Sequence, residues 1–249
     1  LDAREGGYDL DATARGERGQ ALAGPVLLDF NSNPFTLRTR GSWRGDTVDL
    51  AQIEATAPQL LALHGNATLT LGATPELALG RLVIEALEFP AAYTSLMQIT
   101  LAATDFGDLV TAGRASGTAR FAHNALERID LQLEHFSTYN EREFFMKDVA
   151  GELHWAAATN ADVSPSWLSW SSGGAYGLSG GASRVAFVTR AASFALIEPW
   201  HMPIFDGAID IRTLAVSGAG TPDMNVRLDA DIEPISMPPI CKAFRLPES

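Results

Sequence analysis

The sequence predicts an all-β protein built on a long antiparallel, amphipathic β-sheet with few short helices. Two patterns favour this class. Apolar and polar residues alternate in short runs along most of the chain, and a period of two is that of a β-strand. Turn-favouring residues separate these runs at intervals of about 10–15 residues, as expected for consecutive antiparallel strands rather than βαβ units.

The expected elements begin with a polar, glycine-rich segment, residues 1–24, in which Tyr8 and Leu10 offer at most one edge strand. From residue 25 onward we expect the sheet itself. Strand-like patterns cover residues 26–30, 35–38, 47–50, 68–71, 82–89, 97–103, 118–121, 129–134, 149–155, 185–189, 193–197, 209–216 and 226–232. Short helices are expected at residues 55–64, 105–112 and 238–244.

The strand at 226–232 shows the pattern most clearly. Val226, Leu228 and Ile232 fall on one face, and the charged residues between them fall on the other. The sequence offers no helical layer to cover such an apolar face. The face must therefore pack on itself, on another sheet or on a ligand. A closed sandwich gives the first solution, and a curled, open groove gives the last.

The charge of the chain limits its partners. Its 249 residues carry a formal net charge of −12 and no stripe of Lys or Arg. Phosphate backbones would be repelled, so nucleic acid is not an expected partner. Direct docking on anionic lipid headgroups is disfavoured as well, because it needs basic clusters.

Residues that would mark an enzyme are missing, and we expect no catalytic group, metal or cofactor. Ser179 lies in a G-x-S-x-G match at 177–181, but a nucleophile elbow needs a helix after the serine, and a strand-like segment follows. The five histidines lack the spacing of metal ligands. Cys241 is the only cysteine, and we expect it to be a small buried hydrophobic residue.

Four tryptophans gather in the second half of the chain: Trp155, Trp167, Trp170 and Trp200. Core packing accounts for such an aromatic load. A surface that lines acyl chains or lies close to a membrane is the less favoured alternative. The sequence leaves both interpretations open.

Four segments in the last part of the chain carry turn and strand motifs: GELHW at 151–155, SW at 169–170, PIFDGA at 203–208 and EPISM at 233–237. In these motifs the chain from Val149 onward resembles the YdbH-like family, once labelled a dicarboxylate transport domain and grouped with the AsmA-like and TamB-like proteins of Gram-negative envelopes. Phe205 stands where the family's P-x-L-D-G-x-L turn has leucine. Residues 1–148 share with the family only a general pattern of amphipathic strands.

The resemblance implies a bridge-like protein of the periplasm, anchored in the inner membrane and reaching partners at the outer membrane. Phospholipids would move along its β-groove with their acyl chains inside and headgroups outside. Because the chain begins with Leu1 and shows no anchor, we expect an internal segment of a longer protein. Burial of acyl surface would yield about 25 cal/mol per Å², so no headgroup-specific site is needed.

Our leading hypothesis is that residues 25–249 form an open β-groove that conducts phospholipids and has no enzymatic activity. The alternation predicts a lining that includes Leu153, Trp155, Val185, Phe187, Val226, Leu228 and Ile232. A shift of register by one residue would invert this assignment. The alternative is a scaffold domain of an envelope assembly, folded as a closed β-sandwich, and a third possibility is an esterase that uses Ser179.

Overall fold

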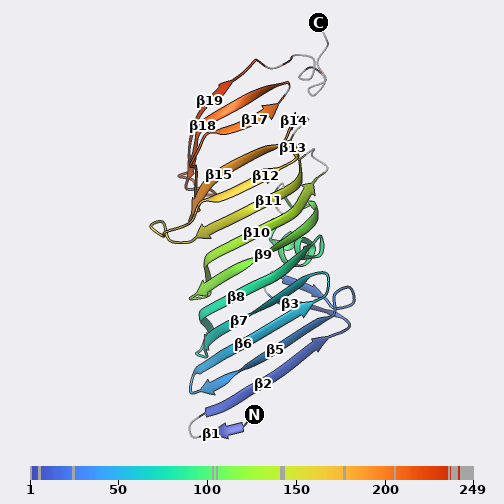
Figure 1. Cartoon of the computed structure of the whole chain (residues 1–249). Coiled ribbons are helices and arrows are strands. Elements are labelled where there is room, and N and C mark those ends of the chain that lie inside the picture. The colour runs from blue at the N-terminus through green and yellow to red at the C-terminus, as the bar shows by residue number, and fades with distance from the viewer. Residues whose placement is uncertain are drawn as a thin grey trace. The chain divides into compact units, whose positions relative to one another are not determined.

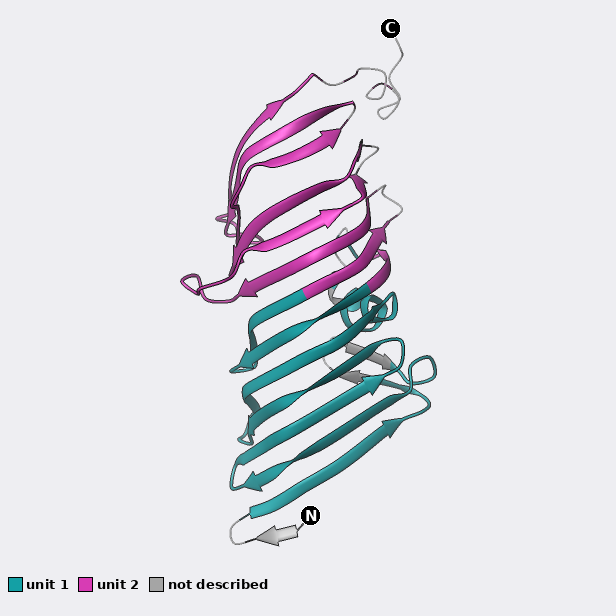
Figure 2. Ribbon diagram, in the orientation of Figure 1, with its two compact units in different colours: residues 1–107, 114–131 teal, residues 108–113, 132–249 magenta. Residues whose placement is uncertain are grey.

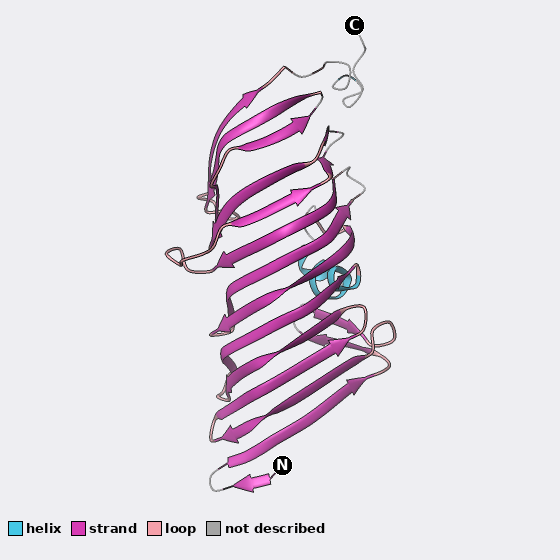
Figure 3. Cartoon of the chain, in the orientation of Figure 1, coloured by secondary structure: helices cyan, strands magenta, loops and turns pink. Residues whose placement is uncertain are grey.

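The computed structural model confirms the all-β class (Figure 1). Strands hold 68% of the chain and helices 5%, whereas strands make up about 20–25% of an average globular protein. Among the elements that the structure describes, the two helices follow one another in one short stretch (Figure 3). The structure describes residues 2–4, 7–23, 26–102, 104, 106–140, 144–175, 178–204, 206–234, 236 and 241.

The described strands pair into one 17-stranded sheet and one separate two-stranded sheet. The chain divides into two compact units, the first made of residues 1–107 and 114–131 and the second of residues 108–113 and 132–249 (Figure 2). The long strands β9 (Val110–Ala122) and β10 (Ala125–Tyr139) pair with each other and contribute to both units.

Unit 1 is an antiparallel meander in which each strand pairs with the next one along the sheet. Its strands in order are β1 (Asp2–Arg4), β2 (Gly7–Gly16), β5 (Phe35–Arg44), β6 (Thr47–Ala57), β7 (Leu61–Thr70) and β8 (Glu76–Phe89). Tyr8 and Leu10 lie in β2, between β1 and β5. β3 (Gln20–Ala23) and β4 (Val26–Asp29) form the separate hairpin.

The pairing register sorts the side chains of unit 1 onto two faces. Leu37 is opposite Ala55, Ala55 is opposite Leu63, and Leu63 is opposite Ile84. Because directly paired residues point to the same side of a sheet, these apolar residues share one face. The residues between them are polar, such as Arg38 opposite Glu54. Bulges in β6 and β8 bend the strands and preserve this separation.

A short helical segment follows β8 and consists of η1 (Tyr93–Met97) and α1 (Gln98–Leu101). Tyr93 is buried, and its hydroxyl donates a hydrogen bond to the carbonyl oxygen of Phe106. η1 also contacts β4 of the separate hairpin. The strand expected at 97–103 is therefore wrong. Short apolar–polar alternation does not distinguish strand from helix, and Met, Gln and Leu are good helix formers.

Two expected helices are also wrong. Residues 55–64 form the end of β6, a turn and the start of β7. Pro58 and Gln59 make that turn, with Gln59 at a φ of 64°; pairing in the sheet overrides the helix propensity of the flanking Ala and Leu residues. Within 105–112, residues 106–108 form a turn and β9 begins at Val110.

Unit 2 continues with nine strands: β11 (Phe145–Ala156), β12 (Ser166–Trp170), β13 (Ser172–Ala175), β14 (Leu178–Gly180), β15 (Ser183–Arg190), β16 (Ser193–Leu196), β17 (Trp200–Ile204), β18 (Gly207–Ser217) and β19 (Asn225–Ile232). In this unit β11 pairs with β12, β12 with β15, β15 with β16, β16 with β18, and β18 with β19. β17 also pairs with β18. These pairings are antiparallel apart from a two-residue parallel contact between β11 and β15.

Cys241 is buried, as the sequence predicts. The rest of the helix expected at 238–244 lies outside the described residues, as do Phe205 and Met237 of the family motifs. No helix within the described ranges is long and apolar enough to cross a membrane.

Gly65 offers a test of the register that separates the two faces. A Cβ at this position would collide with the backbone carbonyl of Arg81 on β8, whereas a Cβ at Gly72 would make only an ordinary contact, 3.8 Å from the carbonyl oxygen of Thr74. We expect Gly65→Ala to lower the free energy of unfolding by about 1–3 kcal/mol and Gly72→Ala to change it by less than about 0.5 kcal/mol. Urea denaturation measures both, and equal effects would contradict the β7–β8 register.

Candidate functional site

The seven residues predicted to line a groove all lie on one face of unit 2. On β11 and β12, Gly151 is opposite Leu168, and Leu168 is opposite Val185 on β15. Alternation along β11 and β15 then brings Leu153, Trp155 and Phe187 to the side of Val185. Trp155 lies opposite Thr189 of β15, which agrees with this assignment.

The same face extends to the last strand. Phe187 is opposite Leu196, Phe194 is opposite Val216, and Val216 is opposite Val226. A bulge between Ile211 and Thr213 adds one residue to β18 and keeps Ile209 opposite Ile232. The apolar face of unit 2 thus comprises Val149, Leu153, Trp155, Leu168, Trp170, Val185, Phe187, Phe194, Leu196, Trp200, Met202, Ile209, Ile211, Leu214, Val216, Val226, Leu228 and Ile232.

Exposure differs sharply along this face. Val185 and Phe187 retain 8% and 6% of their accessible surface, and the ring of Phe187 lies 5.0 Å from that of Phe194. On β19, by contrast, Val226, Leu228 and Ile232 are 54%, 62% and 66% exposed. The middle of the face is therefore packed by its neighbours, while its last strand presents large apolar side chains to the surroundings.

Three of the four tryptophans belong to the apolar face. The rings of Trp170 and Trp200 meet edge to face at 5.8 Å. The indole N–H of Trp155 donates to the carbonyl oxygen of Ala191 at 2.9 Å, and that of Trp200 donates to the Ser183 hydroxyl at 3.0 Å. Such partners let an indole stay in an apolar surface. Trp167 lies on the opposite face, with the Arg184 guanidinium 5.5 Å from its ring.

Unit 1 carries a second apolar face, which the predicted set of site residues does not include. It is formed by Phe35, Leu37, Ile53, Leu63, Leu69, Leu82 and Ile84, none of which is fully buried. Its buried leucines are Leu61 and Leu87, which lie opposite each other at the end of β8 that precedes the helical segment. The same alternation identifies this face in the sequence. The seven predicted lining residues, however, all come from the part of the chain after residue 148, which carries the family resemblance.

The opposite faces are polar and rich in ion pairs. Arg40 binds Asp11 at 3.1 Å in unit 1, and Arg212 lies 3.8 Å from Asp229 in unit 2. More than half of each of these side chains is exposed, so each pair contributes little, about 0–1 kcal/mol. These faces are built to remain in water.

All five histidines lie next to a carboxylate, at distances of 3.5 Å or less: His64 by Glu85, His123 by Glu76, His135 by Asp148, His154 by Glu152 and His201 by Asp210. The hydrogen bond that the His135 ring donates to the Asp148 carboxylate, and then the charge of that carboxylate, raise the pKa of His135 above its ordinary value. Within the described residues, no three His, Cys, Asp or Glu side chains gather closely enough to hold a metal ion.

Ser179 does not lie in the strand–turn–helix setting of a nucleophile elbow. It lies in β14 opposite Gly174 of β13, and β15 follows it instead of a helix. His201 pairs with Asp210 at 2.7 Å, but its backbone carbonyl, not its imidazole, is bonded to a serine hydroxyl, that of Ser183. Gly177 of the G-x-S-x-G match lies outside the described residues.

Comparison with known proteins gives no match to a family model, to a curated protein or to a solved structure. The resemblance to the YdbH-like family stays a prediction from the motifs of this sequence. The candidate site therefore consists of the two apolar faces.

The contact between His135 and Asp148 predicts a pH dependence. Since the folded protein holds the pKa of His135 above about 6.5, the stabilisation is complete below that pH and is lost as the pH rises through the raised pKa. NMR titration of the His135 ring should give a pKa above that of the Asp148→Asn variant. Identical titration curves would show that the contact is absent in solution.

Proposed function

We propose that this chain is a segment of a bridge-like periplasmic protein that conducts phospholipids between the inner and outer membranes. The acyl chains would lie along the apolar faces of the two units, curled as a groove, while the polar faces stay in water. One observation carries the proposal: each unit has a sheet face of large apolar side chains that the described residues leave partly uncovered. No catalytic step is part of it.

The energetics favour hydrocarbon as the occupant of these faces. Full burial of a Val, Leu or Ile side chain yields about 1.5–3 kcal/mol. Since more than half of the surface of Val226, Leu228 and Ile232 is exposed, covering each would yield about 1 kcal/mol. These contributions add along a strand but no single position dominates. A lining of this kind retains an acyl chain and still lets it slide.

The arrangement of polar groups supports the same function. Several residues that alternate with the apolar lining on β18 and β19 are charged, and Arg212 pairs with both Asp229 and Asp231. Along the apolar face, the indole N–H groups of Trp155 and Trp200 are bonded within the protein. The surface offered to a ligand is therefore hydrocarbon, which suits acyl tails and offers nothing to a small dianion.

A scaffold role in an envelope assembly is the alternative, and β19 favours it. Among the described strands β19 pairs only with β18, so its outer edge has free backbone N–H and C=O groups next to exposed apolar side chains. Such an edge can accept a strand from a partner protein. In this role protein, not lipid, would cover the apolar faces.

Substitutions at two adjacent residues of β8 distinguish the lipid conduit from the scaffold. Leu82 lies on the apolar face of unit 1, opposite Gly65, and Val83 lies on the polar face, opposite His64. We expect Leu82→Asp to abolish phospholipid loading, because it buries a charge against acyl chains, and Val83→Asp to leave loading unchanged. Native mass spectrometry with lipid extraction, on protein purified from a bacterial periplasm, measures the bound lipid.

Leu228→Asp extends the test to unit 2, and its high exposure means that the protein should still fold. Phe187→Asp should also abolish loading but is the riskier variant, because Phe187 is buried. Circular dichroism and secretion level control for folding. A wild-type protein free of lipid, or equal loading in the Leu82→Asp and Val83→Asp variants, would contradict the lipid conduit and favour the scaffold.

A further inference from the structure

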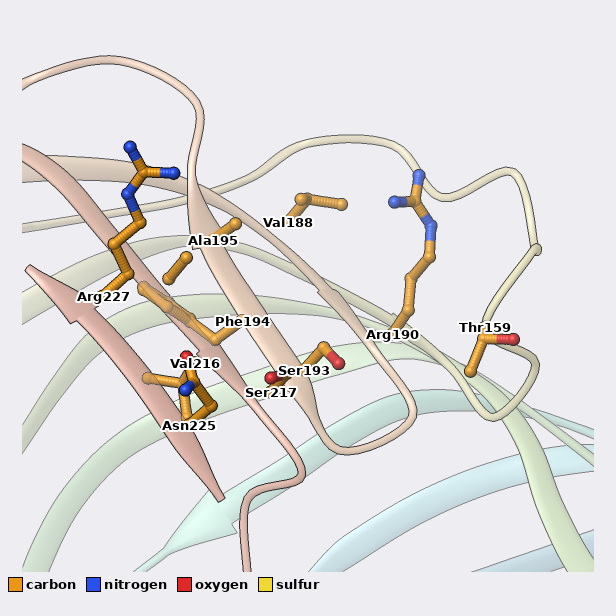
Figure 4. Close-up of a pocket in the computed structure, with 11 residues that line it drawn as sticks. Thr159, Val188, Arg190, Ser193, Phe194, Ala195, Val216, Ser217, Asn225 and Arg227 are labelled. Atoms are coloured by element: carbon orange, nitrogen blue, oxygen red, sulfur yellow. The ribbon is translucent and has the colours of Figure 1, made fainter. Parts of the chain in front are cut away.

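The polar face of unit 2 carries a hollow of about 360 Å³ above β15, β16, β18 and β19 (Figure 4). Arg190 at the end of β15 and Arg227 on β19 border it, and their guanidinium groups extend to the same side. The register explains why they share this face. Ala215 of β18 is opposite both Arg227 and Ala195, and Ala195 lies on the same side of β16 as Ser193, the partner of Arg190.

The lining has an unusual charge composition for this chain. Acidic residues outnumber Lys and Arg by 30 to 18 overall, yet no carboxylate lines the hollow. Its other polar groups are the neutral side chains of Thr159, Ser193, Ser217 and Asn225, which can all donate hydrogen bonds. The polar part of the lining is thus a set of donors with two positive charges, and the remaining lining residues, Val188, Phe194, Ala195, Ala215 and Val216, are apolar.

Arg227 is left without a carboxylate by the arrangement of its neighbours. Asp229 is the next residue on the same face of β19, but its carboxylate forms an ion pair with Arg212 at 3.8 Å. Arg212 also binds Asp231. Within the described part of the chain, Arg227 consequently forms no ion pair, and its guanidinium stands at the rim of the hollow.

Arg190 is held in place without being neutralised. Its Nε donates to the carbonyl oxygen of Ala161 at 2.7 Å, which anchors the side chain to the loop after β11. No described carboxylate pairs with Arg190, so both terminal nitrogens remain available. A planar guanidinium anchored in this way is suited to two parallel hydrogen bonds with a phosphate group.

We propose that this hollow, the Arg190–Arg227 hollow, binds a ligand that carries a phosphate group. The phosphate group lies in the hollow and accepts hydrogen bonds from the donors that line it, while Val188 and Ala195 contact the remainder of the ligand. The volume lies at the lower end of the range for ligand pockets, about 300–1,000 Å³, which suits a small phosphate ester. The net charge of −12 does not prevent binding, because salt screens charges beyond about 8 Å.

The same chemistry occurs in a free phosphate ester and in a phospholipid headgroup, and the experiment distinguishes the two sources. The full chain is titrated by calorimetry with inorganic phosphate and with glycerol 3-phosphate, and in a separate arm it is floated with phosphatidylglycerol vesicles. Arg227→Gln and Arg190→Gln should each weaken binding about tenfold or more, since each removes a charge-assisted hydrogen bond. Arg184→Gln removes the same charge from the same face but from a residue paired with Glu198 at 2.8 Å; it should leave binding within about twofold.

Binding of either soluble phosphate that depends on Arg227 identifies a free ester as the ligand. Binding to vesicles alone, lost in Arg227→Gln and kept in Arg184→Gln, identifies a headgroup. Absence of binding in both arms at millimolar concentration overturns the proposal, as does equal weakening by Arg227→Gln and Arg184→Gln. The hollow lies on the face opposite the proposed acyl surface, so this result is independent of lipid loading.

Discussion

The strand register is the constraint on which the rest of the structure depends. Because side chains alternate with a period of two, the antiparallel pairing that puts Leu63 opposite Ile84 also puts every polar neighbour on the other side. Bulges, such as the one between Ile211 and Thr213, insert a residue without exchanging the faces. In each unit, the pairing of backbone groups thereby creates one surface for hydrocarbon and one for water.

The polar and apolar faces differ in how their side chains find partners within the protein. On the polar faces, ion pairs such as Arg40 with Asp11 are complete within the sheet, and Arg227 stands out because its neighbours already bind each other. On the apolar faces, Phe187 is covered by surrounding side chains, whereas Leu228 is not. Covering this hydrocarbon with a partner would be favourable, and this connects the fold to the proposed function.

The sequence predicts the strands and faces well, because alternation records directly which side chains are solvated. The seven residues predicted to line a groove share one face, as expected, and the bulge in the β18–β19 pairing adds its extra residue to β18, so the alternation of β19 is kept. The failures have local causes. Strands β12 and β17 lack a clear alternation, since Ser and Trp mix in the first and a proline interrupts the second. The Arg190–Arg227 hollow is invisible in the sequence, because it depends on which arginines on neighbouring strands are left unpaired.

The central claim is that acyl chains contact one face of these sheets and not the other. Site-specific photo-crosslinking tests it most directly, with a photoreactive side chain placed in β18 at Leu214, on the apolar face, or at Thr213, on the polar face. In the cell envelope, the account predicts phospholipid adducts from position 214 and none from position 213. Equal lipid adducts from both positions, or adducts to protein alone from position 214, would contradict it.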